Sequence, residues 1–189
     1  MKNILENALK NSISYQDYRN LIHQLLAEEK STGPIQSEEL TNYSLLNEAR
    51  MKRLDKTIEI EDEIIAEFQK IDETQKWLVI TESWCGDAAH VVPVLNKLAE
   101  ISENIDLKLV LRDENEALMD QFLTNGGRSI PKLIAINLDV FSSPWSWGPR
   151  PDVLQEWYLN KKSAADFNYE TVSEEMHLWY AKNRHAELV

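Results

Sequence analysis

The sequence predicts an α/β domain with a helical extension in front of it, and three observations support this fold class. Short apolar runs typical of buried strands cover residues 77–81, 106–111 and 132–136. Segments with helical periodicity separate these runs, over residues 88–100 and 113–123. A hairpin follows the last run, so the order of elements indicates right-handed parallel crossovers with an antiparallel edge strand.

Residues 1–60 are expected to form a helical extension that packs on the core. Apolar side chains share one helical face between residues 15 and 26, and Ser14 is suited to cap the start of that helix. A Ser-Thr-Gly-Pro sequence at residues 31–34 breaks it. A second helix is expected to end near Lys56. The apolar stripes of these helices need a partner, which is either an exposed sheet edge or a second subunit of a dimer.

Residues 61–189 are expected to form the α/β domain, with additional helices at its carboxyl end. A helix over residues 64–71 leads into the first strand. A later helix begins at Asp113 and stops at an Asn-Gly-Gly sequence, because glycines commonly end helices. The remaining predicted elements are an edge strand over residues 140–146 and two helices, around residues 151–160 and 171–183.

Composition excludes several classes of function. A net charge of -12 disfavours nucleic acid and anionic membrane surfaces, and no apolar stretch has the length of a membrane span. The amino terminus lacks the apolar core of a secretory signal, so we expect a cytoplasmic protein. A single cysteine forms no intrachain disulfide, and His23, His177 and His185 show no ligand spacing. We therefore expect neither a metal nor any other cofactor.

Cys85 is the lone cysteine, and it lies in the turn between the first strand and the next helix. The free N–H groups and the positive dipole end of that helix favour a thiolate, which is the nucleophilic form of the side chain. The carboxylates of Glu82 and Asp87 act in the opposite direction. On balance we expect a thiol that is more acidic than free cysteine.

The residues around Cys85 resemble the thioredoxin superfamily. Residues 84–88, Trp-Cys-Gly-Asp-Ala, resemble the W-C-G-P-C active site of that family, and Pro93 matches its kink proline. Residues 128–132, Arg-Ser-Ile-Pro-Lys, resemble the segment that ends in a cis-proline opposite the thiol. The resemblance covers roughly residues 64–146. Together with the helical extension, the W-C-G-D sequence is similar to a bacterial thioredoxin-like subgroup of poorly defined role.

The resemblance implies a thioredoxin-like fold, a central mixed sheet flanked by helices, and a catalytic role for Cys85. It also implies a substrate-binding edge formed by the neighbours of the thiol in this fold: Trp84, Gly86, Asp87, Ile130 and Pro131. An extended peptide is expected to bond to the main chain of Ile130, as in strand addition. Asp87 also has a structural interpretation, as an acid that stabilises the first turn of its helix.

Three departures from the family pattern matter. Ala88 stands where the family has its resolving cysteine, either as a natural monothiol or as an engineered trap for mixed disulfides. Asp87 replaces the active-site proline, and Val79 replaces a buried acid that serves the second cysteine. The missing acid favours a natural monothiol, since there is no second thiol to deprotonate.

These observations leave three functional hypotheses. The leading one is a monothiol thiol–disulfide oxidoreductase, in which Cys85 attacks a protein or small-molecule disulfide and an external thiol resolves the adduct. The alternative is a redox-inactive binding module that keeps only the peptide-binding edge. A thiol peroxidase ranks below both, because the residues before Cys85 lack the threonine and proline of that class.

Overall fold

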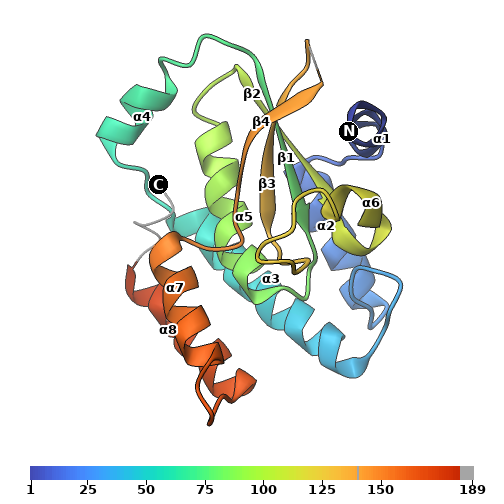
Figure 1. Cartoon of the computed structure of the whole chain (residues 1–189), viewed down its shortest axis with the longest axis vertical. Helices are drawn as coiled ribbons and strands as arrows, with labels where there is room; N and C mark the ends of the chain where they lie inside the picture. Colours follow the sequence, from blue (N-terminus) through green and yellow to red (C-terminus); the bar gives the residue numbers. More distant parts are fainter. Residues whose placement is uncertain (140, 184–189) are drawn as a thin grey trace.

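A four-stranded mixed sheet forms the centre of the computed structural model, which describes residues 1–139 and 141–183 (Figure 1). Its strands lie in the order β2-β1-β3-β4. β1 is parallel to β2, β3 is antiparallel to β1, and β4 is antiparallel to β3. The strand bounds are Gln75–Thr81, Ile105–Leu111, Lys132–Asn137 and Ser142–Trp147 for β1 to β4. The expected α/β class with a mixed sheet is thereby confirmed.

The expectation of several parallel crossovers is wrong, because β3 runs antiparallel to its neighbour β1. The predicted helix over residues 113–123 is replaced by η1 (Arg112–Glu114) and the single turn of α6 (Glu116–Met119). Four helical residues span about 6 Å, whereas a seven-residue strand spans about 23 Å. The chain therefore does not return to the start of β1. β3 begins at the opposite end, with Lys132 beside Ile80.

Alternate side chains of the strands point to opposite faces of the sheet, and helices cover both faces (Figure 1). One face carries the larger cluster, to which Val79 and Leu109 contribute. Its helices are α2 (Tyr15–Ala27), α3 (Glu38–Thr57), α5 (Gly86–Ala99), α7 (Asp152–Lys162) and α8 (Tyr169–Asn183). The other face packs against α6 and against α1 (Lys2–Lys10), a helix that sequence patterns did not predict.

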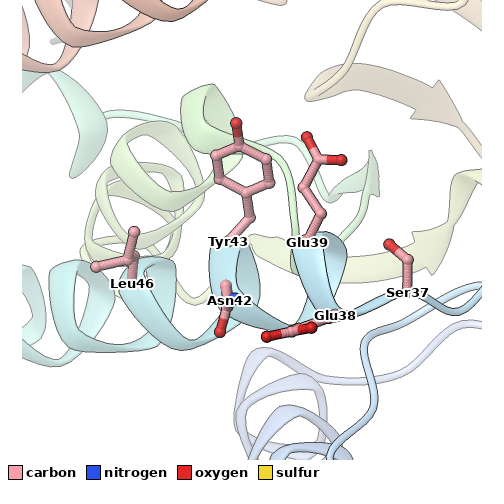
Figure 2. Close-up of a pocket in the computed structure, with 6 residues that line it drawn as sticks. All are labelled: Ser37, Glu38, Glu39, Asn42, Tyr43 and Leu46. Atoms are coloured by element: carbon pink, nitrogen blue, oxygen red, sulfur yellow. The ribbon is translucent and has the colours of Figure 1, made fainter.

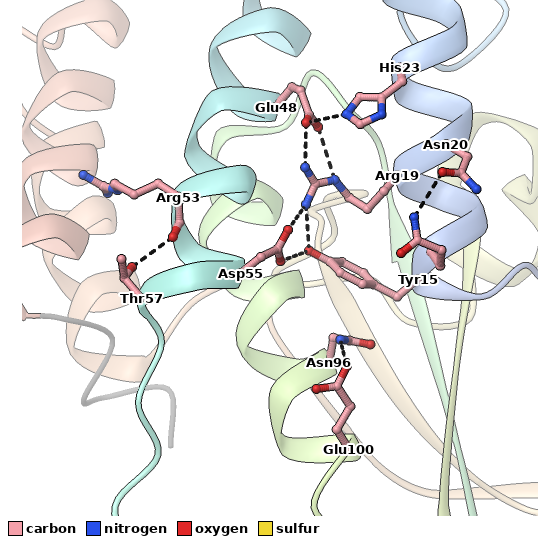
Figure 3. Close-up of polar contacts among 11 residues, drawn as sticks. Tyr15, Arg19, Asn20, His23, Glu48, Arg53, Asp55, Thr57, Asn96 and Glu100 are labelled. Atoms are coloured by element: carbon pink, nitrogen blue, oxygen red, sulfur yellow. Dashed lines mark hydrogen bonds and ion pairs between the residues drawn. The ribbon is translucent and has the colours of Figure 1, made fainter.

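A buried ion-pair network joins α2 to α3 (Figure 3). The guanidinium of Arg19 donates to Glu48 Oε1 at 2.6 Å and also pairs with Asp55. Tyr15 donates its hydroxyl proton to Asp55 at 2.7 Å, and His23 lies 2.7 Å from Glu48. Because Arg19 is buried and every charge has a partner, this network holds the two helices in one alignment.

Several local predictions hold. The side chain of Ser14 accepts the N–H of Asp17 at the start of α2, as a cap should. The third predicted helix is α4 (Asp62–Phe68), and the edge strand is β4, although Val140 lies outside the described residues. Among the described residues, no helix is both long enough and apolar enough to cross a membrane.

Candidate functional site

Cys85 lies where β1 ends and α5 begins, so that its side chain caps the helix. The sulfur accepts the N–H of Ala88 at 3.5 Å. The thiol in turn donates to the carbonyl oxygen of Ile130 at 3.3 Å, and the peptide bond from Ile130 to Pro131 is cis. The side chain is half-buried. The predicted thiol and the predicted proline segment, 45 residues apart in sequence, thus lie in direct contact.

The electrostatics of this sulfur differ from the sequence-based expectation. Burial, and after it the negative charge of Asp87, raises the pKa of the Cys85 thiol to about 12. The N–H of Ala88 and the charge of Arg150 lower that pKa, but they do not compensate. The expectation of a thiol more acidic than free cysteine is therefore wrong, because the sequence does not show how far the sulfur is removed from water.

Asp87 lies in the first turn of α5 and is buried, with both carboxylate oxygens bonded within the protein. Arg150 donates to Oδ2 from two nitrogens, at 2.9 and 2.8 Å, and Tyr180 donates to Oδ1 at 3.0 Å. Burial raises the pKa of the carboxyl, while Arg150 and Tyr180 lower it. Asp87 therefore connects α5 to α8 and to the segment before α7.

Gly86 is half-buried because α8 passes directly over it. A Cβ at this position would lie 2.6 Å from Cε1 of His177, so any larger residue would displace that imidazole. The imidazoles of His177 and His90 are hydrogen-bonded at 3.1 Å, and His90 stacks on Tyr180 with ring centroids 4.4 Å apart. Burial, and the nearby charge of Arg50, lower the pKa of His177 to about 4. His177 is thus neutral at pH 7.

The remaining predicted site residues also surround the sulfur. Trp84 is half-buried, and the guanidinium of Arg112 lies 4.7 Å from the centre of its ring. Ile130 and Pro131 are buried, and the carbonyl of Ile130 accepts the thiol proton. The structure brings all six residues predicted from sequence into one region.

A polar network behind the turn ties the N-terminal extension to the site. Glu82 is completely buried, and its carboxylate accepts the hydroxyl of Thr32 and the backbone N–H of Asp113. Burial raises the pKa of Glu82. Ser83 bonds to Ser44 at 2.7 Å, and its backbone N–H donates to Thr32 at 2.8 Å. The conformation of the turn before Cys85 therefore depends on residues from the extension.

The sequence predicted the residues next to the sulfur, but it did not predict the residues that contact them from other elements. One feature of the sequence could have indicated Arg150, because it is a lone basic residue between two prolines. His90 stacks on Tyr180 and so has a packing role. His177 shows no metal-ligand spacing in the sequence, yet it lies on Gly86, whereas His185 falls outside the described residues.

No group of three or more histidine, cysteine, aspartate or glutamate side chains within residues 1–139 and 141–183 is arranged to hold a metal. An open depression of about 530 Å³ runs along the amino-terminal half of α3 (Figure 2). Its lining residues all come from α3 and its cap: Ser37, Glu38, Glu39, Asn42, Tyr43 and Leu46.

Comparisons with known proteins agree with this geometry. A family model described as thioredoxin matches residues 33–168, so the matched region begins before α3 and ends after α7. None of the curated proteins compared with the chain matches it.

Two crystal structures resemble the chain in fold. One is a protein of unknown function from Pseudomonas aeruginosa, with 18% identity and a TM-score of 0.53, covering 74% of this chain and 86% of that one. The other is an HIV epitope scaffold, with 16% identity and a TM-score of 0.56, covering 93% and 92% of the two chains. At such identities the likeness concerns the fold alone.

Proposed function

The chain belongs to the thioredoxin family, and on this basis we propose that it is a monothiol thiol–disulfide oxidoreductase. The Cys85 thiolate attacks one sulfur of a substrate disulfide, forms a mixed disulfide and releases the other sulfur as a thiol. An external low-molecular-weight thiol then attacks the mixed disulfide. Attack on the substrate sulfur frees Cys85 and leaves the external thiol disulfide-bonded to the substrate. Attack on the Cys85 sulfur instead releases the substrate as a thiol, and a second external thiol then forms a disulfide with the first and frees Cys85.

The observation that carries this proposal is the position of the sulfur. Cys85 caps α5, is half-exposed and contacts the carbonyl of Ile130 beside the cis peptide bond. An extended peptide aligned along residues 130–131 would present its disulfide to this sulfur. Ala88, which is buried, supplies no second thiol, so resolution needs an external one.

The chemistry predicts a strong pH dependence. Because the thiol pKa is raised to about 12, only a small fraction is thiolate at neutral pH. The reaction rate should therefore rise about tenfold per pH unit from pH 7 to pH 9. The assay uses a mixed disulfide between a cysteine peptide and β-mercaptoethanol, with β-mercaptoethanol as the resolving thiol. The rate above that of the thiol alone is measured for the wild type and for Cys85→Ser.

Cys85→Ser is expected to reduce this rate to that of the external thiol alone. The trapped intermediate should appear in mass spectra of the wild type as an adduct on Cys85 when the external thiol is omitted. Equal rates for the two proteins, with no adduct, would refute the oxidoreductase.

A redox-inactive binding module is the second candidate, and the raised thiol pKa favours it. In this alternative Cys85 contributes packing and a hydrogen bond to Ile130, but no covalent chemistry. Wild type and Cys85→Ser would then bind a serine analogue of the peptide equally well, and neither would form an adduct at pH 9.

The finer assignments are part of the same proposal. The W-C-G-D-A sequence and the preceding helices support membership of a bacterial thioredoxin-like subgroup. A cytoplasmic location fits the lone cysteine, since reducing compartments supply the external thiol that the cycle requires.

A further inference from the structure

Lys132 is a buried cation at the edge of the candidate site. It follows Pro131 directly and is the first residue of β3. Its side chain is only slightly exposed, and its Nζ donates to Thr124 Oγ1 at 2.6 Å and to the carbonyl oxygen of Gly148 at 2.7 Å. Within residues 1–139 and 141–183, no carboxylate lies within ion-pair distance of this ammonium.

Such an arrangement is unfavourable for stability alone. Removing an ammonium from water costs free energy that neutral acceptors recover only in part. Burial accordingly lowers the pKa of Lys132. A methionine of similar length would fill the same space without this cost. The charge of Lys132 therefore indicates a role other than packing.

One acceptor of Lys132, the carbonyl of Gly148, belongs to a loop that packs against the proline beside the thiol. Gly148 has a positive φ of 111°, and a Cβ there would collide with the carbonyl oxygen of Pro131. The backbone at residue 148 is thus pressed against the proline that follows Ile130. Thr124 also donates to the carbonyl of Gly148, at 3.4 Å. The ammonium of Lys132 therefore links three segments: its own, after Pro131, and those that contain Thr124 and Gly148.

The same loop continues into the group that holds Asp87. Arg150, two residues after Gly148, donates to the carboxylate of Asp87 beside the sulfur. Fixing the Gly148 carbonyl with a charged donor therefore fixes both borders of the site: the main chain at residues 130–131 and the loop at residues 148–150. Hydrogen bonds with a charged partner are stronger than neutral ones, which suits this purpose.

We propose that Lys132 is a positioning residue that fixes the edge formed by residues 130–131 and 148–150, so that an extended polypeptide disulfide binds in line with Cys85. This role rests on the proposed function of Cys85. It concerns polypeptide substrates, because a small disulfide reaches the sulfur without using the edge. Lys132 itself does not touch the reacting atoms.

The test compares Lys132→Met with Lys132→Arg, which restores a cation, and with Lys108→Met as a matched control. Lys108 lies on β2, where it pairs with Asp106 on the far side of β1 from β3. Two substrates are used at pH 9: the peptide mixed disulfide and the oxidised dimer of β-mercaptoethanol. For Lys132→Met we expect the KM of the peptide to rise about tenfold, with little change in kcat, because the edge that binds the peptide loses its charged hydrogen bonds.

The small disulfide should react with all four proteins at equal rates, and Lys132→Arg should recover most of the peptide KM. Wild-type values for Lys132→Met with both substrates would overturn the inference. An equal loss with both substrates, or no recovery in Lys132→Arg, would also overturn it, since either would indicate a merely structural role.

A binding measurement separates this inference from the proposed function. In a Cys85→Ser background, the affinity for a serine analogue of the peptide is measured with and without Lys132→Met. We expect about tenfold weaker binding without the lysine, whether or not the wild type turns over. Absence of Cys85-dependent turnover would refute the oxidoreductase alone, whereas unchanged affinity would refute the role of Lys132.

Discussion

At Cys85, the amino terminus of α5 and the carboxylate of Asp87 act on one sulfur in opposite directions. Both influences are visible in the sequence, because a strand, a turn and a helix meet there and Asp87 follows two residues later. Burial decides the balance, since it adds to the effect of the carboxylate and raises the thiol pKa. The sulfur packs against both core clusters, and α8 passes over the neighbouring Gly86, a contact between residues about 90 positions apart that local patterns do not show.

Asp87→Asn is expected to lower the pKa of Cys85 by about one pH unit, because it removes a nearby like charge. It also frees the guanidinium of Arg150, whose charge favours the thiolate. The rate of alkylation by iodoacetamide, measured as a function of pH, gives the thiol pKa. Asp152→Asn is the matched control: Asp152 lies in the first turn of α7, is exposed and should leave the alkylation profile unchanged.

Asp87→Asn also leaves Arg150 buried without its anionic partner, so the free energy of unfolding should fall by about 3 kcal/mol. The thiol pKa and the free energy of unfolding together test the role of Asp87. A destabilised protein with an unchanged thiol pKa would show that Asp87 is structural and has no electrostatic effect on the sulfur.

At the scale of the elements, sequence patterns predicted most helices and strands, and they failed where long-range contacts decide. The helices over residues 15–27, 38–57 and 86–99 follow from apolar periodicity and capping residues. The helix expected after Asp113 does not form in full. The backbone N–H of Asp113 donates to the side chain of Glu82, 31 residues earlier, and a local pattern cannot reveal that partner.

The docking of α8 on α5 should depend on pH through His177. Its pKa falls from 6.5 in an unfolded chain to about 4 in the fold, so the folded state binds fewer protons between these values. Stability is complete above pH 6.5 and is lost as the pH falls towards 4. Allowing for its partial exposure, we expect a loss of about 2 kcal/mol in unfolding free energy across this window.

His177→Gln should remove this part of the pH dependence, because glutamine keeps a hydrogen-bonding group towards His90 but does not titrate. Urea unfolding at pH 7 and pH 4 measures the difference. Leu178→Gln, at an exposed side chain on the same helix, serves as the control and should retain the wild-type loss. Equal pH dependence in the wild type and His177→Gln would contradict the assigned cause.

At the scale of the whole molecule, the sequence separated an extension from a domain, and the structure shows how closely the two are packed. The match to the thioredoxin family already begins at residue 33. Thr32 from the extension completes the bonding of Glu82, and Asn47 of α3 donates to the carbonyl of Ser83. Charge and hydropathy patterns show that such helices need a partner, but they do not identify which surface supplies it.

The helix α1 provides the strictest test of this integration, since no pattern predicted it and it covers the sheet face opposite α5. Leu5 is completely buried there, in the same cluster as Ile80 and Ile130. Leu5→Ala should lower the unfolding free energy by about 3 kcal/mol, the usual cost of a cavity in a core. The matched change Leu45→Ala, at a leucine that is 58% exposed on α3, should cost less than about 0.5 kcal/mol. Chemical denaturation measures both. Equal and small effects would mean that α1 lies on the molecule without stabilising it. The residues before α2 would then contribute nothing to the core that contains Ile130.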